Sequence, residues 1–330
     1  IVFGDWSSDV CSSDLSGVEL ADGSVLFFGG TPPRCGPEHS GKPCSEQPAT
    51  ASYRYFPKVD RWELVPNLSI HFASGWFWNT GSTNQWPRRD ALVRRNGDFV
   101  YLDSGNHWQR DAQSPTRVMR WSPGSPPNEL ASLQTRRTHA TLLELNASKK
   151  RVGNRPKLVV VGGFEYKENG ELVQGQPTVS TEYFDDLANR WLSGPSAHYP
   201  GGAAFKLANG RIFKLSLKTS SSEHGYQAEI ADAAFRRWYK LPPLTAQFRS
   251  GRQGESHSTL TEVIAAGNRV YLVYGSADRH TVYWDDNRRR WIKPKPWSSD
   301  ALLPDYLLPL DRRRILVRTS ETFDVVPYPH

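Results

Sequence analysis

Long hydrophobic runs and methionine are both scarce in this 330-residue chain. The longest apolar runs, such as Val159-Val160-Val161, have the length of a strand, which argues against a transmembrane helix. A single methionine stands beside 12 Trp, 13 Tyr, 14 Phe, 26 Gly and 24 Pro. This mixture fits many short strands joined by tight turns better than a helical bundle. The length suits one large all-β domain or two medium ones.

Residues 5–15, DWSSDVCSSDL, resemble the in-frame translation of a common sequencing adapter. We interpret residues 1–15 as non-native and joined to a truncated reading frame, so that residues 16–330 form the domain. The alternative is a genuine Ser-rich leader. On the first interpretation the native N-terminus is missing, and the cysteines that count are Cys35 and Cys44.

The chain is basic, with a formal net charge of +7 that rises to +10 without the three aspartates of residues 5–15. Such a charge can indicate nucleic-acid binding. The basic runs, however, fall where hairpins are expected to turn: Lys149-Lys150-Arg151, Arg288-Arg289-Arg290 and Arg312-Arg313-Arg314. We interpret them as solvated loops and expect no nucleic-acid partner, which leaves an anionic ligand open.

Hairpin signals recur along the chain. Asn-Gly and Asp-Gly between apolar runs favour type I′ turns, because both central residues need positive φ. Short apolar strands, several of them ending in small residues, follow Asp22-Gly23, Asn96-Gly97, the loop after Leu145, Asn209-Gly210, Gly267-Asn268 and Asp311. In the first and third repeats the strand ends in a full Gly-Gly pair, Gly29-Gly30 and Gly162-Gly163.

A second half-motif follows four of these hairpins. An aromatic or β-branched residue precedes a Trp across turn-like residues in the pairs Tyr55/Trp62, Tyr183/Trp191, Ile230/Trp238 and Tyr283/Trp291. The second repeat lacks this Trp and reads Val118-Met119-Arg120-Trp121, which indicates a degenerate unit.

Together these half-motifs resemble the kelch repeat, within the galactose oxidase-like superfamily and of a bacterial type. The resemblance covers residues 16–330 and implies an all-β, kelch-type β-propeller of about six four-stranded antiparallel blades, or seven in the intact protein. The expected blades lie near 16–68, 86–133, 136–196, 198–244, 255–297 and 301–330. The last has no obvious fourth strand, and propellers of this kind usually close by borrowing a strand from the other terminus.

In such a fold the first strand of each blade lies innermost, so its start faces the channel mouth. The aligned starts carry Arg89-Asp90, Arg137 with His139, Gly201-Gly202, Glu255 with His257, and Asp305-Tyr306. Arginines could bind a carboxylate bidentately, and His or Glu could move a proton. We therefore take Arg137, His139, Glu255 and His257 as catalytic candidates and Arg89 and Asp90 as ligand-binding candidates. Alternatively, these residues simply line a wet channel.

An aromatic insertion follows the first repeat. Trp76, Trp78 and Trp86 fall within it, and the alternation of the first two places them on one face of an extended segment. Exposed Trp faces are platforms for sugar rings or protein partners, so these three are further ligand-binding candidates. The alternative is that they plug the channel end or pack on a neighbouring blade.

Cys35 and Cys44 lie nine residues apart in a segment rich in Pro, Gly and Ser. They could form a disulfide, which suits a periplasmic or secreted protein. Adding His39 gives only three metal ligands, short of the usual four of a zinc site, so no metal is expected. Two unpaired cytosolic thiols are the other alternative.

Three classes of function fit the scaffold. The favoured one is a non-enzymatic recognition propeller, an extracytoplasmic monomer that binds a neutral or anionic glycan or protein through loops at one channel mouth. The alternative is a sugar-modifying enzyme like the kelch-type sialic acid mutarotases. Galactose oxidase chemistry is excluded because no aromatic–Cys arrangement can be traced, and no cofactor is expected. An intracellular adaptor would need added domains, and the Ser-x-Asp-x-Gly-x-Thr-Trp boxes of sialidases are absent.

Overall fold

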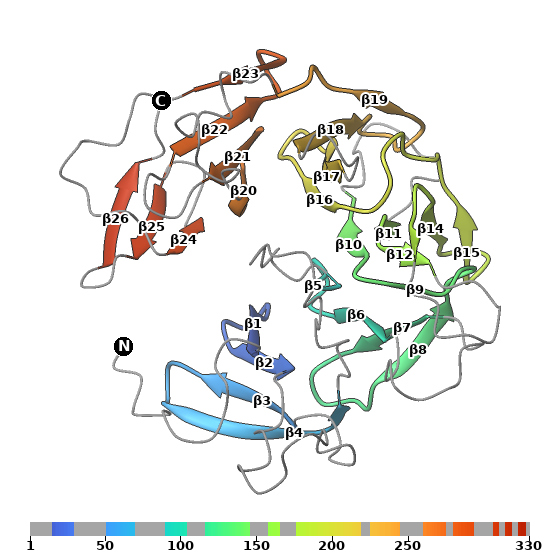
Figure 1. Cartoon of the computed structure of the whole chain (residues 1–330). Helices are drawn as coiled ribbons and strands as arrows, with labels where there is room; N and C mark the ends of the chain where they lie inside the picture. Colours follow the sequence, from blue (N-terminus) through green and yellow to red (C-terminus); the bar gives the residue numbers. More distant parts are fainter. Residues whose placement is uncertain are drawn as a thin grey trace, which may run out of the picture.

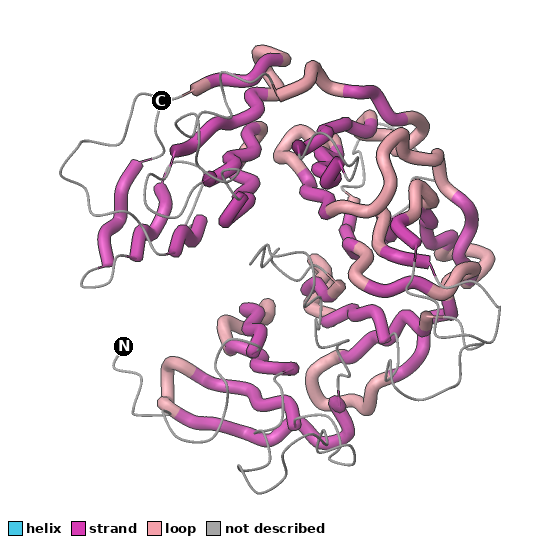
Figure 2. The backbone as a smooth tube through the Cα atoms, in the orientation of Figure 1, coloured by secondary structure: helices cyan, strands magenta, loops and turns pink. Residues whose placement is uncertain are grey.

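The structure, a computed structural model, describes residues 15–29, 51–69, 90–103, 116–145, 158–165, 176–218, 225–244, 260–274, 280–293, 306–309, 314–318 and 323–327. Strands are the only regular elements in these ranges, as Figure 2 shows along the backbone tube. The predicted all-β class is therefore confirmed. In the same ranges no helix has the length and apolar character needed to cross a membrane.

Six main sheets follow one another along the chain, and each is purely antiparallel. Sheet 1 contains β1 (Leu15–Glu19), β2 (Val25–Gly29), β3 (Ala51–Phe56) and β4 (Arg61–Ser69). Sheet 2 contains β5 (Ala91–Val93), β6 (Phe99–Asp103), β7 (Arg117–Trp121) and β8 (Asn128–Ser132). Sheet 3 contains β10 (Thr141–Glu144), β11 (Leu158–Val161), β14 (Thr181–Asp185) and β15 (Arg190–Ser193).

Sheet 4 contains β16 (Ala203–Lys206), β17 (Ile212–Lys218), β18 (Gly225–Ala231) and β19 (Trp238–Lys240). Sheet 5 contains β20 (Leu260–Ala266), β21 (Arg269–Tyr274), β22 (His280–Asp285) and β23 (Arg290–Ile292). Sheet 6 has three described strands, β24 (Tyr306–Pro309), β25 (Arg314–Arg318) and β26 (Phe323–Pro327). A small extension sheet adjoins sheet 3 and contains β9 (Arg137–Thr138), β12 (Phe164–Glu165) and β13 (Gln176–Pro177).

Hairpins form at Asp22-Gly23, Asn96-Gly97, Asn209-Gly210 and Gly267-Asn268, but the predicted type I′ geometry is wrong, because only the glycine of each turn has positive φ. The turn expected at Asp311 lies outside the described residues. Gly23, Gly97 and Gly210 have φ values of +80°, +90° and +84° between paired strands. The second sheet is complete even though it lacks the Trp of the other repeats. Trp121 on its third strand is buried against sheet 1 instead, so a shifted aromatic supplies the missing bulk.

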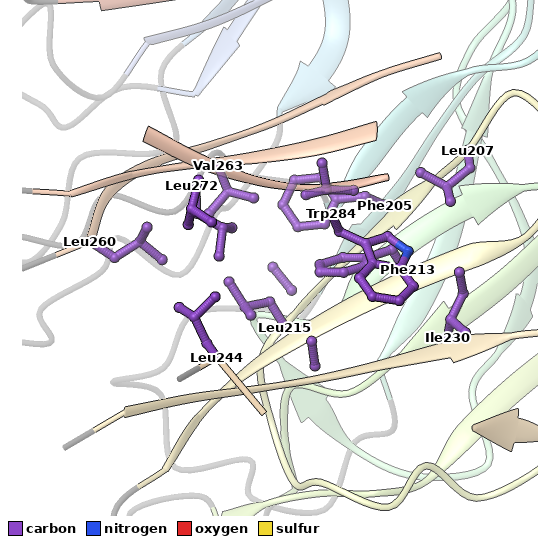
Figure 3. Close-up of a cluster of buried hydrophobic side chains, with 14 residues drawn as sticks. Phe205, Leu207, Phe213, Leu215, Ile230, Leu244, Leu260, Val263, Leu272 and Trp284 are labelled. Carbon is purple, nitrogen blue, oxygen red and sulfur yellow. The ribbon is translucent and has the colours of Figure 1, made fainter. Parts of the chain in front are cut away.

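The sheets are arranged in an arc around a common centre, with β1–β4 and β24–β26 at its two ends (Figure 1). The hydrophobic core of sheets 1 to 5 lies between the sheets, because second strands such as β6 and β11 bury apolar side chains on both faces. One buried cluster joins each successive pair from sheet 1 to sheet 5. Figure 3 shows the cluster between sheets 4 and 5, where Phe205 and Phe213 pack beside Trp284. Such radial stacking of four-stranded sheets is compatible with the β-propeller class.

The Trp of the fourth strand faces the preceding sheet. Trp191 and Trp238 are 2% and 5% exposed, packed against sheets 2 and 3 respectively. Trp62 occupies the same position in sheet 1 but is 40% exposed. It lies with Tyr53 and Leu64 on the sheet 1 face that turns away from sheet 2. Sheet 1 therefore presents an aromatic face that has no described sheet against it.

Candidate functional site

Sheets 1 to 5 point the same way, because the first hairpin turns of neighbouring sheets contact each other, and this part of the molecule therefore has two distinct ends. The first hairpin turns of sheets 1 and 2 lie together, with a Cβ on Gly97 3.4 Å from the Cβ of Ala21. In sheets 4 and 5 the equivalent turns are bonded, with Ala208 N–H donating to the carbonyl of Gly267 at 2.8 Å. We call this the hairpin end. The opposite end, where each second strand stops and each third strand starts, is called the loop-rich end.

The loop-rich end collects most of the long connections. Antiparallel order places both the second-to-third connection and the link to the next sheet at this end. The connections that start and finish there include residues 30–50, 70–89, 104–115, 166–175, 245–259 and 294–305. Turns at the hairpin end are mostly two to six residues long, apart from the stretch 145–157. Long loops on a rigid scaffold are where binding residues concentrate.

Most sequence-predicted site residues lie outside the described residues. These are Arg89, Glu255, His257, Trp76, Trp78, Trp86, Cys35 and Cys44. Each belongs to a connection that starts and finishes at the loop-rich end. The described candidates Asp90, Arg137 and His139 lie at or beside the starts of first strands, at the same end. The described strands that flank these connections begin or end at the loop-rich end, where Asp90, Arg137 and His139 also lie.

Arg137 is fully buried, and all three nitrogens of its guanidinium group have hydrogen-bond partners. Its Nε donates to Thr135 Oγ1 at 3.2 Å, and its Nη1 donates to the carbonyl oxygens of Gly162 and Ser180. Its Nη2 pairs with Glu182 Oε1 at 2.8 Å. Burial lowers the pKa of Arg137, which the nearby carboxylates oppose. The geometry therefore favours a scaffold role for this catalytic candidate.

Glu165 is the part of this network that reaches the surface, with a side chain 24% exposed. Its Oε1 lies 3.7 Å from Nη2 of Arg137 and accepts hydrogen bonds from the hydroxyls of Thr178 (2.7 Å) and Ser180. The Glu165 carboxylate is thus held by two hydroxyl donors, Thr178 and Ser180, and by an ion pair with Arg137. It forms a fixed negative group at the loop-rich end.

His139 is exposed and lies in the left-handed region, with φ of +55°. Its Nδ1 lies 3.1 Å from Thr138 Oγ1, and its ring packs edge-on against Phe164 at 6.0 Å. A non-glycine residue with positive φ stores backbone strain, which is more frequent at functional positions. Of the catalytic candidates within the described ranges, His139 is the one that a ligand can reach.

Glycine pairs let neighbouring sheets approach closely at this end. A Cβ on Gly162 would lie 2.9 Å from the carbonyl oxygen of Gly201 in the next sheet. A Cβ on Gly163 would overlap the carbonyl of Thr138, and one on Gly202 would overlap that of Leu215. Glycine at these positions therefore lets backbone segments approach more closely than a side chain would allow.

A second buried ion pair, which sequence reasoning missed, supports the link between sheets 3 and 4. The side chains of Lys214 and Glu229 are both 0% exposed, and Nζ lies 2.9 Å from Oε1. Burial lowers the pKa of Lys214, while Glu229 opposes that shift. Glu229 also accepts the backbone N–H groups of His198 (2.7 Å) and Tyr199 (3.2 Å). The sequence did contain a signal for this pair, because Glu229 interrupts the apolar run Ala228-Glu229-Ile230.

Sheet 3 repeats this arrangement with different residues. Glu182, on its third strand, accepts the backbone N–H groups of Gln134 (2.6 Å) and Thr135 (3.4 Å) and pairs with Arg137. In both sheets a buried glutamate therefore fixes the incoming linker and is neutralised by a buried cation. We call each such unit a linker clamp; its members in sheet 4 are Lys214, Glu229 and the backbone of residues 198–199.

The described residues contain no group of three or more His, Cys, Asp or Glu side chains suited to hold a metal ion. Comparison of the sequence with models of known protein families gives no match, and comparison with curated proteins also finds none. The function must therefore be argued from the site itself.

Proposed function

We propose that the chain is a kelch-type β-propeller that recognises a glycan or protein ligand through its loop-rich end. One observation supports the proposal: the described strand ends that flank residues 70–89 and the other long connections lie at the same end as the exposed His139. Aromatic platforms on a rigid frame suit recognition of sugar rings or protein hot spots. The linker clamps add rigidity at this end, because they fix the backbone of the linkers that enter sheets 3 and 4.

The repeat pattern supports a closed ring as part of this proposal. The fourth-strand Trp of sheets 3, 4 and 5 packs on the preceding sheet, whereas Trp62 of sheet 1 is 40% exposed and belongs to none of the buried clusters among the described residues. In β25 the run Ile315-Leu316-Val317 is apolar at consecutive positions, which predicts a strand with two buried faces. A closed ring in which sheet 6 packs on the aromatic face of sheet 1 would bury both this face and the apolar residues of β25.

The mutarotase-like alternative asks Arg137 to hold a ligand carboxylate. All of its donors already have partners within the fold, so Arg137 does not favour that alternative. The other candidate arginine, Arg89, lies outside the described residues, and the exposed His139 is the described candidate that the alternative retains. The proposal also places the protein outside the cytoplasm, with Cys35 and Cys44 joined. Mass spectrometry of the intact protein before and after reduction tests the disulfide, which predicts a gain of about two mass units from added hydrogens.

The direct test is a glycan-array screen of the protein beside its Trp76→Ala/Trp78→Ala variant. The expected result is selective binding that the double variant loses. Tyr239→Ala, which removes an exposed aromatic from the outer strand β19, is the matched control and should bind normally. If the double variant binds as well as the unaltered protein, the Trp-rich connection is not the site. If no glycan binds, a protein ligand is the remaining form of the proposal.

A further inference from the structure

Three side chains with unoccupied polar groups cluster over the linker clamp of sheet 4. His198 and Tyr199 follow each other in the linker, and Lys240 pairs directly across from Glu229 on the neighbouring strand. The Lys240 ammonium lies 5.5 Å from the centre of the Tyr199 ring. The three residues therefore lie at the surface of the loop-rich end, between sheets 3 and 4.

The buried carboxylate orients the imidazole. Nδ1 of His198 lies 3.1 Å from Glu229 Oε2, while the His198 side chain is 39% exposed. A neutral ring that donates from Nδ1 to a carboxylate keeps Nε2 as an acceptor. Among the described residues, His198 Nε2, Lys240 Nζ and the Tyr199 hydroxyl have no hydrogen-bond partner. Burial and Glu229 raise the pKa of Tyr199, so its hydroxyl stays protonated at neutral pH.

Sheet 3 provides an internal comparison for the cluster. Its clamp has Gln134, Thr135 and Ser193 at the positions of His198, Tyr199 and Lys240. These three side chains bond within the fold: Gln134 bonds the Trp191 carbonyl and Ser193, and Thr135 bonds Glu182. Neutral residues thus suffice to complete a clamp. We therefore expect sheet 4 to fold without the base, aromatic ring and cation at these three positions.

We propose that His198, Tyr199 and Lys240 form a binding subsite for a carboxylate-bearing saccharide. Lys240 would pair with the sugar carboxylate, Nε2 of His198 would accept a hydrogen bond from a ring hydroxyl, and Tyr199 would contact the apolar face of the ring. The chain's net positive charge favours an anionic ligand over a neutral one. This inference rests on the proposed function and specifies its ligand class.

The test transplants the sheet 3 residues onto sheet 4. The variant His198→Gln/Tyr199→Thr/Lys240→Ser keeps the Lys214–Glu229 pair and should unfold at nearly the same temperature. Calorimetric titration with a galacturonate tetramer should show at least tenfold weaker binding than in the unaltered protein. A neutral galactose tetramer should bind weakly to both. Arg236→Ser, which removes one exposed cation at the hairpin end, should bind the acidic tetramer normally.

Each outcome separates this inference from the proposal on which it rests. Equal binding of the acidic tetramer by the triple variant overturns the subsite, as does equally tight binding of the neutral tetramer. If the array shows glycan binding that depends on Trp76 and Trp78 but not on the triple substitution, the proposed function stands and the subsite fails. Should the triple variant misfold, Lys240→Ser alone changes only an exposed side chain and must still weaken binding.

Discussion

Glu182 and Glu229 are buried carboxylates that each bind the backbone of a linker and pair with a buried cation. Removing the cation of such a pair leaves an uncompensated buried charge, which costs about 3–5 kcal/mol. Arg137→Met should therefore lower the free energy of unfolding by that amount, measured by urea denaturation. Arg236→Ala breaks an exposed ion pair with Asp232, so its effect should stay below about 1 kcal/mol. A comparable loss in both variants would show that Arg137 is not buried as described.

Tyr101 gives the fold a measurable dependence on alkaline pH. Its side chain is 3% exposed, and burial, reinforced by Asp103, raises its pKa to about 12 from 10.0. The folded state thus holds its proton where the unfolded state has lost it, so stability must fall as pH rises from 10 to 12. The loss is roughly 2–3 kcal/mol at about 1.4 kcal/mol per pKa unit. Tyr101→Phe should remove this part of the dependence in denaturation curves; an unchanged dependence would contradict the assignment.

Glycine is required at some positions for two separable reasons: a left-handed backbone conformation, and a lack of space for a Cβ. Gly163 has φ of +85° and no room for a Cβ against the Thr138 carbonyl, whereas Gly124 has φ of +86° and open space. Gly124→Ala should cost about 1–2 kcal/mol, the strain of a left-handed residue alone. Gly163→Ala should cost distinctly more, because backbone of the extension sheet must also shift. Thermal unfolding of the two variants checks this, and equal losses would exclude the close approach.

The strands could be predicted from the sequence because their signals are local. Asn209-Gly210 marks a turn, and Trp238 marks a fourth strand, within a few residues of the elements they define. The linker clamps could not be predicted in this way. Glu229 meets His198 from 31 residues away, and nothing in the local pattern states which linker it will fix. Arg137 lies just before the first strand of sheet 3, and its burial depends on partners as distant in the sequence as Glu182.

Closure of the arc is testable through the aromatic face of sheet 1. If sheet 6 covers this face, Trp62→Ala should cost about 3–5 kcal/mol, as expected for Trp238→Ala at the equivalent buried position. If the face stays open, the 40% exposed Trp62 should cost far less than Trp238. Urea denaturation of the two variants distinguishes these cases. Concentration-independent light scattering would show that any cover comes from the same chain.

The central claim is that ligands bind at the loop-rich end. Hydrogen–deuterium exchange, with and without the glycan that binds most strongly on the array, tests it most directly. The account predicts slower exchange of backbone amides at this end, in residues 137–139, 178–180 and 198–202. Exchange in the turns of the hairpin end, residues 208–210 and 267–268, should stay unchanged. Protection confined to the hairpin end, or no protection at saturating glycan, would contradict the claim.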